Sequence, residues 1–62
     1  MYRILIVDDE PMALYSTAHT FPWAAWGFDP PVLMTEAPAA LDKLRTERFD
    51  AAIVDIGMGE ME

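Results

Sequence analysis

The amino-acid sequence predicts an α/β fold in which strands and helices alternate as β-α-β-α-β around a three-stranded parallel sheet. Three short apolar runs predict strands at 2–7, 32–35 and 51–54, and two segments with helical periodicity lie between them, at 11–20 and 38–47. The first run shows no alternation of polar and apolar residues, so both of its faces should be buried, as in a parallel sheet. Short strands that alternate with helices are typical of βαβ units and right-handed crossovers.

The first strand ends at an acidic segment. Tyr2–Val7 is a run of β-branched and leucine residues with one arginine, and the residues D-D-E-P follow it at 8–11. Pro11 suits the first position of a helix, because its missing N–H would have no partner there. Asp9 or Glu10, just before it, can cap the free N–H groups of that helix. The sequence therefore predicts that a helix starts immediately after the acids.

The two helices and the aromatic segment between them supply the expected core. The first helix should bury one face, formed by Leu14, Ala18 and Phe21. The second should bury Ala40, Leu41 and Leu44. Four aromatic residues are expected to pack at the edge of the sheet, namely Phe21, Trp23, Trp26 and Phe28. The third strand, 51–54, is expected to be buried and to deliver Asp55 at its end.

Composition limits the classes of function. The 62 residues carry 11 acids against 4 bases, a net charge of −7, which argues against nucleic-acid binding by this segment. A chain this short forms at most one domain with a small core. It has no cysteine, which excludes disulfides and thiolate zinc sites and favours a cytoplasmic location. The apolar start is too short for a signal peptide or a membrane span.

Three carboxylates follow two of the predicted strands. Asp8 and Asp9 follow the first strand and Asp55 follows the third, so all three should lie at the same edge of a parallel sheet. If the first strand is central, they flank the crevice where open α/β sheets bind ligands. Their mutual repulsion would be relieved by a divalent cation, and hard oxygen ligands suit Mg²⁺. A carboxylate beside Mg²⁺ can attack phosphorus, which predicts phosphoryl transfer to a carboxylate.

These motifs resemble those of a known family. Residues 4–11 (I-L-I-V-D-D-E-P) resemble the opening of response-regulator receiver domains, and residues 49–62 (F-D-A-A-I-V-D-I-G-M-G-E-M-E) resemble their phosphoacceptor segment. Trp23 and the Gly27-Phe28 pair are similar to receivers attached to AraC-type DNA-binding domains. The resemblance implies that residues 1–62 are the N-terminal half of a receiver, with a partial flavodoxin-like fold and strand order 2-1-3.

The resemblance also implies roles for individual residues. Asp55 would be the phosphoacceptor, Asp9 a direct Mg²⁺ ligand and Asp8 a ligand partly through water, and the backbone carbonyl of Gly57 would complete the set. The donor would be a phosphohistidine on a sensor histidine kinase in the cytoplasm. The domain would act in transcription regulation as a phosphoacceptor and not as an enzyme. The family's later Thr/Ser and Lys, and any DNA-binding output domain, would lie outside this segment.

Other interpretations remain open. Asp8 and Asp9 alone could be a helix cap in a solvated turn. A second functional class is a structural or interaction fragment that is not phosphorylated and associates through its third strand. A haloacid-dehalogenase phosphatase would need D-x-D-x-T/V where this sequence has V-D-D-E-P, and no Gly-rich turn supports a dinucleotide or P-loop site. His19 is expected to be a surface or packing residue, since no second ligand or base accompanies it.

The third strand carries a prediction of its own. In the order 2-1-3 it lies at an edge, where Ile53 and Val54 would expose unpaired backbone groups and apolar side chains. Such edges recruit further strands, and oligomerisation is one of the few ways in which a small core without disulfides gains stability. In the complete fold of the receiver family this edge would pair with a fourth strand. For residues 1–62 alone the sequence therefore predicts either self-association, most simply as a two-fold dimer through the third strand, or a chain that is largely unfolded when dilute.

Overall fold

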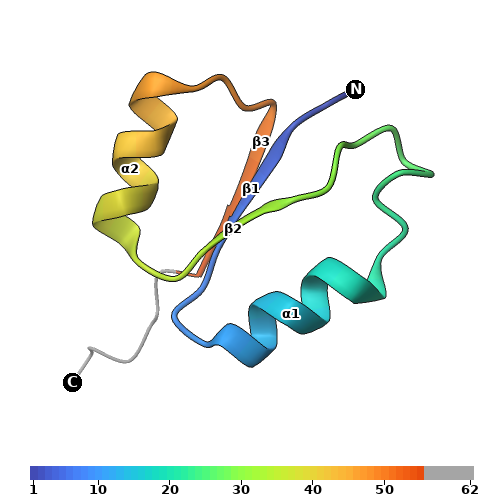
Figure 1. Ribbon diagram of the computed structural model, residues 1–62, viewed down its shortest axis with the longest axis horizontal. Coiled ribbons are helices and arrows are strands. Elements are labelled where there is room, and N and C mark those ends of the chain that lie inside the picture. Colours follow the sequence, from blue (N-terminus) through green and yellow to red (C-terminus); the bar gives the residue numbers. More distant parts are fainter. Residues whose placement is uncertain (56–62) are drawn as a thin grey trace.

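Five elements alternate along the chain, in the predicted order (Figure 1). The computed structural model describes residues 1–55, which form β1 (Ile4–Val7), α1 (Pro11–Thr20), β2 (Val32–Met34), α2 (Ala37–Thr46) and β3 (Ala51–Val54). The bounds of α1 and β3, the end of β1 and the start of β2 agree with those predicted, and the remaining ends differ by one or two residues. Neither helix in this part of the chain has the length and apolar character that crossing a membrane requires.

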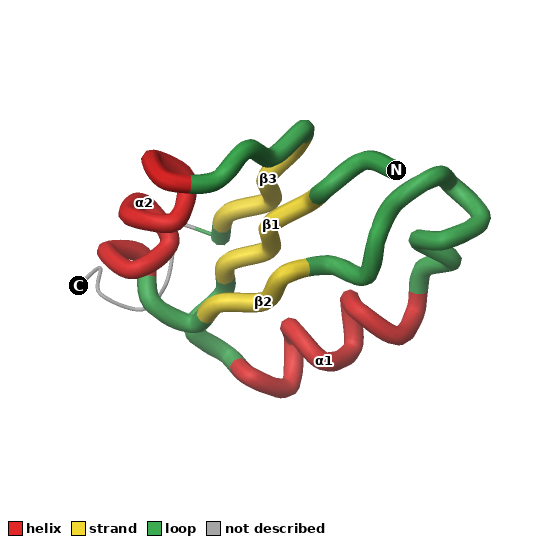
Figure 2. Tube along the Cα trace, turned by 45° about the horizontal axis from the view of Figure 1, so that its top comes forward, coloured by secondary structure: helices red, strands yellow, loops and turns green. Residues whose placement is uncertain are grey.

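The three strands form one parallel sheet with β1 in the centre (Figure 2). Its order is β2-β1-β3, which confirms the predicted partial flavodoxin-like arrangement. Leu5 lies opposite Val32 of β2, and Val7 lies opposite Val54 of β3. All four residues of β1 are buried, as their continuous apolar run predicts. The central position of β1 also makes β3 an edge strand among the described residues.

The two helices cover opposite faces of the sheet (Figure 1). Successive side chains of β1 point to opposite sides, so they divide between two cores. On the α1 side Ile4 and Ile6 pack with Leu14 and Trp23, and on the α2 side Leu5 and Val7 pack with Ala40. The connection from β1 to β2 and the one from β2 to β3 run in opposite directions across the sheet. Helices on opposite faces therefore give both crossovers the same hand.

β3 is not buried, which corrects one prediction from the sequence. All four of its residues are exposed, and the side chains of Ile53 and Val54 keep 48% and 42% of their surface open to solvent. The composition A-A-I-V suits a strand covered on both faces. However, β3 lies at the edge of the described sheet, so no strand lies along its outer side. The two helices lie mainly over the other strands of the sheet and leave β3 exposed.

The aromatic segment before β2 is divided between core and surface. Trp23 is buried, and its indole N–H donates a hydrogen bond to the carbonyl of Thr17, 3.3 Å away. Phe28 is half-buried and packs edge-to-face against Trp23. Phe21 and Trp26 remain 45% and 53% exposed, although their ring centroids lie 5.8 Å and 5.7 Å from that of Trp23. They pack within the aromatic segment, whereas the burial expected for Phe21 on the face of the first helix is not observed. Trp23 and Phe28 are covered because they pack against residues of α1 and β1.

Arg3 joins the start of β1 to the loop before β3. Its backbone N–H donates to Asp50 Oδ2 at 2.8 Å, and its guanidinium donates to the carbonyl of Arg48 at 3.0 Å and to Glu47 Oε1 at 2.9 Å. The guanidinium also lies over the ring of Phe49, 4.5 Å from its centroid. These contacts hold the chain where it enters β3, at the end of the sheet opposite to the acidic segment.

Candidate functional site

The register of the sheet brings two acidic positions side by side. Val7 and Val54 are partners in the ladder, so Asp8 and Asp55 are the next residues along neighbouring parallel strands. The backbone N–H of Asp55 donates to the carbonyl of Val7 at 3.0 Å, and that of Asp8 donates to the carbonyl of Met34 at 3.1 Å. The sheet therefore fixes the backbone of both residues at its carboxyl edge, where the sequence predicted them.

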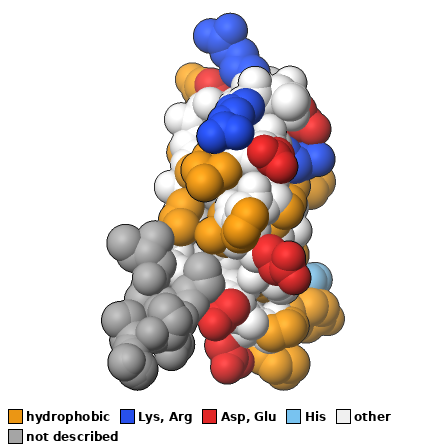
Figure 3. All heavy atoms as spheres, turned by 90° about the vertical axis from the view of Figure 1, so that its left-hand side faces the viewer, with side chains coloured by type: hydrophobic (Ala, Val, Ile, Leu, Met, Phe, Trp, Pro, Cys, Tyr) orange, Lys and Arg blue, Asp and Glu red, His pale blue; other side chains and the backbone are white. Residues whose placement is uncertain are grey.

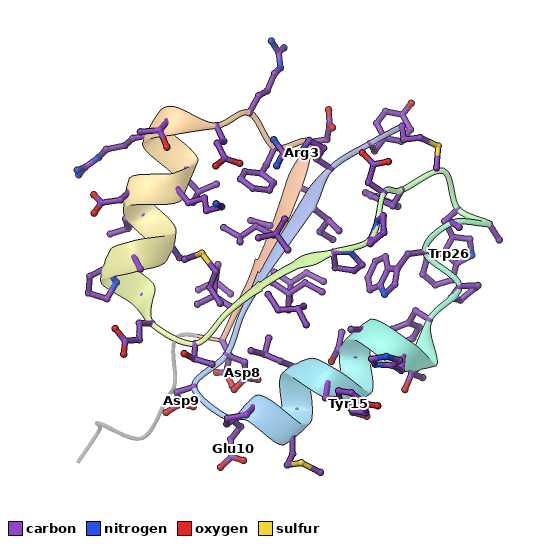
Figure 4. The ribbon with its side chains drawn as sticks, viewed as in Figure 1. Arg3, Asp8, Asp9, Glu10, Tyr15 and Trp26 are labelled. Carbon is purple, nitrogen blue, oxygen red and sulfur yellow. The ribbon has the colours of Figure 1, made fainter. Side chains whose placement is uncertain are left out.

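Asp8, Asp9 and Glu10 lie together where β1 passes into α1 (Figure 4). Asp8 is half-buried, and its Oδ1 accepts a hydrogen bond from the backbone N–H of Glu10 at 3.0 Å. The N-cap residue of α1 is Glu10, and its own side chain makes no capping hydrogen bond. Support for the turn therefore comes from Asp8, and not from Glu10 as the sequence allowed. An aspartate that bonds the N–H two residues later forms an Asx-turn, and this spacing was already visible in the sequence.

Asp9 and Asp55 are exposed, in contrast to Asp8. An exposed carboxylate at the end of a rigid strand can be reached by a large donor molecule, while its backbone stays fixed by the ladder. This combination suits a group that must be modified by another protein. The half-buried Asp8 is better suited to hold the turn and to add negative charge beside the other two.

Basic residues lie at the other end of the molecule (Figure 3). The sequence has four lysine and arginine residues. Arg3 precedes β1 and Arg48 precedes β3, while Lys43 and Arg45 lie in the last turn of α2. Ion pairs hold three of the four to acids of that end: Arg3 to Glu47 at 2.9 Å, Lys43 to Glu47 at 3.0 Å and Arg45 to Asp42 at 3.6 Å. The acidic edge therefore has no lysine or arginine of its own chain to balance its charge, and a cation from solution is the natural substitute.

The donor chemistry of the acidic edge suits Mg²⁺, but the complete ligand set is not assembled within the described residues. Carboxylate oxygens are the ligands that Mg²⁺ prefers. Among residues 1–55, no three Asp, Glu or His side chains form a group that could hold a metal ion. Of the four ligands that the sequence suggested, the carbonyl of Gly57 lies outside the described residues. The metal site therefore stays a prediction that rests on Asp8, Asp9 and Asp55.

His19 does not join the acidic edge. It lies in the last turn of α1, is exposed, and stacks on Tyr15 with 4.1 Å between ring centroids. Its Nδ1 lies 2.8 Å from the carbonyl of Tyr15. Tyr15 projects from the outer side of α1 in Figure 4. His19 lies in the last turn of this helix, at the end away from the acidic residues that precede α1. His19 is thus a surface residue, as predicted.

No protein family, curated protein or solved structure matches this chain. The resemblance to receiver domains therefore rests on the two acidic motifs and the order in which the fold presents them.

A shallow apolar groove was missed in the sequence. It lies between α2 and the carboxyl ends of β1 and β3, has a volume of about 200 Å³, and is lined by Val7, Ala37, Ala40, Leu41, Leu44 and Val54. Ala40 is buried, whereas Leu41 and Leu44 are exposed although both were expected in the core. Their spacing showed that they share a helix face, but only the position of α2 over the sheet decides how far that face is covered.

Proposed function

We propose that this chain is a phosphoacceptor module of the response-regulator receiver kind, which accepts a phosphoryl group on Asp55 from a phosphohistidine of a sensor histidine kinase. The observation that carries the proposal is the register of β1 and β3, which makes Asp8 and Asp55 neighbours at one sheet edge. The exposure of Asp55 supports access by a protein donor. A cytoplasmic location and a role in transcription regulation belong to the same proposal.

The proposed step balances without a further reactant. A carboxylate oxygen of Asp55 forms a bond to phosphorus while the P–N bond of the phosphohistidine breaks, and the leaving imidazole keeps both bonding electrons and takes a proton from water. The backbone of Asp55 is held by its hydrogen bond to Val7, so the nucleophile starts from a fixed position. The product is an acyl phosphate on the protein and a neutral histidine on the donor.

Mg²⁺ would be held by Asp8, Asp9, Asp55 and the carbonyl of Gly57. When bound, it would supply positive charge that offsets the negative charge of the phosphoryl group and of the carboxylates. The chain's own contribution is the register of the sheet, which places the backbones of Asp8 and Asp55 side by side at this edge. No base of this chain lies at that edge, so the cation is the only positive charge the proposal requires there.

The test is covalent phosphorylation by a small acyl-phosphate donor with Mg²⁺, followed by mass spectrometry. The chain should gain one phosphoryl group that is labile in both acid and base, as an acyl phosphate is, and Asp55→Asn should abolish it because an amide does not attack phosphorus. Asp50→Asn is the matched control, since Asp50 is exposed at the other end of the same strand. Equal labelling of the parent and Asp55→Asn would show that the acceptor is another residue.

A further inference from the structure

Asp50 immediately precedes β3 and pairs with Arg3, which immediately precedes β1. The backbone N–H of Arg3 donates to Asp50 Oδ2 at 2.8 Å, and the backbone N–H of Asp50 donates to the carbonyl of Arg3 at 2.8 Å. We propose that Asp50 is a positioning residue, which fixes the register of β3 against β1 and thereby places Asp55 beside Asp8. The inference rests on the proposed function of Asp55 as the phosphoacceptor.

The carboxylate of Asp50 takes the place of a backbone carbonyl in the ladder between β1 and β3. Ile4 is the ladder partner of Ala51, so the residues before them, at 3 and 50, lie opposite each other. In a parallel ladder the carbonyl of Arg3 should then accept from Ala51, whose backbone N lies 3.3 Å away, and the N–H of Arg3 should donate to the carbonyl of Phe49. That N–H donates to the carboxylate of Asp50 instead. The identity of residue 50 therefore decides how the ladder begins.

On the other side of β1 the ladder is extended by backbone groups. The N–H of Tyr2 donates to the carbonyl of Gly27, and the carbonyl of Tyr2 accepts from the N–H of Asp29, both at 2.8 Å. These bonds do not depend on which side chain follows the backbone. Asp29 and Asp50 thus stand in comparable places before β2 and β3, but the carboxylate of Asp50 is itself a member of the ladder.

The side chains of β3 specify its register only weakly. The sequence A-A-I-V is apolar at every position, so it lacks the alternation of polar and apolar residues that decides which face of a strand is buried. A slip of one residue would move Asp55 by about 3.3 Å along the sheet and turn its side chain to the other face. Asp8 would then lie beside a different residue. A polar contact of defined geometry at the start of β3 excludes such a slip.

The side chain of Arg3 holds the loop that leads to Asp50. Its guanidinium donates to Glu47 Oε1 and to the carbonyl of Arg48, and it lies over the ring of Phe49. These three residues directly precede Asp50 in the chain. Arg3 therefore contacts each residue of the short segment that brings the Asp50 carboxylate to the ladder.

Asp50 acts on the proposed acceptor through the strand and not by contact. Arg3 and Asp8 lie at opposite ends of β1 (Figure 4). Asp55 follows Asp50 by five residues, roughly 16 Å of extended chain. A displacement at the start of β3 is carried along the strand to its end, and a misplacement of about 1 Å in a reacting group can cost about 10²-fold in rate.

Amide proton exchange, followed residue by residue by NMR, tests whether Asp50 fixes the register. The N–H of Asp55 bonds β3 to β1, whereas the N–H of Asp8 bonds to Met34 of β2 and reports on the part of the sheet without β3. In Asp50→Ala, exchange at Asp55 should be at least about tenfold faster than in the parent, and exchange at Asp8 should change by less than about threefold.

Three results of the exchange experiment would overturn the proposal. Equal acceleration at Asp55 and Asp8 would mean that the contact stabilises the fold as a whole and not the register. Unchanged exchange at Asp55 in Asp50→Ala would mean that the register is fixed by other contacts. A parent in which the Asp55 amide exchanges as fast as in a free peptide would mean that the register is not fixed at all.

Two further variants separate the acceptor oxygen from the loss of charge. Asp50→Asn keeps an oxygen that can accept from Arg3, so exchange at Asp55 should stay within about threefold of the parent. Asp29→Ala removes one negative charge from the comparable position before β2 and should leave exchange at Asp55 unchanged. An Asp50→Asn variant that behaves like Asp50→Ala would contradict a role for this oxygen in the ladder.

Labelling by the small acyl-phosphate donor measures the consequence for the acceptor. The rate of labelling at Asp55 should fall at least about tenfold in Asp50→Ala and stay near that of the parent in Asp50→Asn. Labelling of Asp50→Ala at the parent rate would overturn the positioning role. A parent that gains no phosphoryl group at Asp55 would refute the proposed function, and amide exchange would still decide whether Asp50 fixes the register.

Discussion

Asp8 and Asp9 are adjacent in sequence but occupy different environments. Asp8 is half-buried and its side chain supports the turn into α1 through the N–H of Glu10. Asp9 is exposed beside it. The same dipeptide thus contains one residue with a structural task and one directed to solvent. We expect the two to respond differently to substitution, with Asp8→Ala affecting folding and Asp9→Ala affecting chiefly cation binding.

Removal of the Asp9 carboxylate should weaken Mg²⁺ binding by about tenfold or more, because few protein oxygens are available to hold the ion. Calorimetric titration of Mg²⁺ into the parent and Asp9→Ala measures this difference. Glu10→Ala is the control, since its carboxylate is also exposed but is not among the proposed ligands. Mg²⁺ affinity that is equal in the parent and in Asp9→Ala would contradict the assignment.

Glu47 provides a prediction for acid pH. Hydrogen bonds from Arg3, and then from Lys43, lower the pKa of Glu47 below the usual glutamate value. The folded state therefore favours the ionised carboxylate, and this stabilisation is complete above the unfolded-state pKa of about 4.3. It is lost as the pH falls from there through the lower pKa of the folded state.

Thermal unfolding between pH 6 and pH 3 should reveal this loss of stability. Glu47→Gln should show a shallower decline with acid than the parent, whereas Glu36→Gln, at the start of α2, should follow the parent. The effect should be small, because Glu47 and both of its cationic partners are accessible to water and salt screens them. Identical pH profiles for the parent and Glu47→Gln would exclude a role for these contacts in stability.

At the scale of elements, α1 depends on very few buried contacts. Leu14 is its only buried residue, 4% exposed, and it packs on Ile4 and Ile6 of β1 together with Trp23. The exposed side of the helix carries Met12, Tyr15 and His19, and the helix contains no Asp, Glu, Lys or Arg. The attachment of one whole helix therefore relies on one leucine and on the tryptophan that follows the helix.

Leu14→Ala should cost about 2–5 kcal/mol, as is usual when a buried leucine is truncated. A core this small provides only a few kcal/mol in total, so the variant should be largely unfolded at 25 °C. Met12→Ala, at a 74% exposed position of the same helix, should change stability by less than about 0.5 kcal/mol. Urea unfolding followed by circular dichroism compares the two, and equal midpoints would mean that α1 is not held through Leu14.

At the scale of the whole molecule, charge is separated along the sheet. Acidic residues lie at the carboxyl edge of β1, while the four lysine and arginine residues lie near the opposite end of the sheet. Three of these four form ion pairs with Glu47 or Asp42. The Cα atoms extend over 38 × 27 × 12 Å, which reflects the three-stranded sheet between two helices that residues 1–55 form. In a molecule this thin, the acids are close to solvent and their repulsion depends on ionic strength.

Salt should therefore stabilise the folded chain. Raising NaCl should increase its thermal midpoint, by up to roughly 5 °C, since about 1 kcal/mol shifts a domain of this size by 4–8 °C. A midpoint that is independent of protein concentration separates charge screening within one chain from association. A midpoint that falls with salt would show that the exposed ion pairs outweigh the repulsion among the acids.

The sequence by itself determined the elements, their parallel arrangement and the positions of the acids. Continuous β-branched runs and the proline after the acidic segment are local signals, and they predicted Pro11–Thr20 and Ala51–Val54 with the observed bounds. Because the carboxyl ends of parallel strands meet at one edge, Asp8 and Asp55 could be expected as neighbours from their positions alone. The register of β1 and β3 bears out this expectation.

The tertiary structure decided which apolar residues are covered and what individual side chains contact. The sequences of β1 and β3 are both apolar, yet β1 is buried and β3 is exposed, because among residues 1–55 β1 has a strand on both sides and β3 has one on a single side. In the same way, Trp23 is buried and Trp26 is not. Burial depends on what lies across the sheet, which is information that a local pattern does not contain.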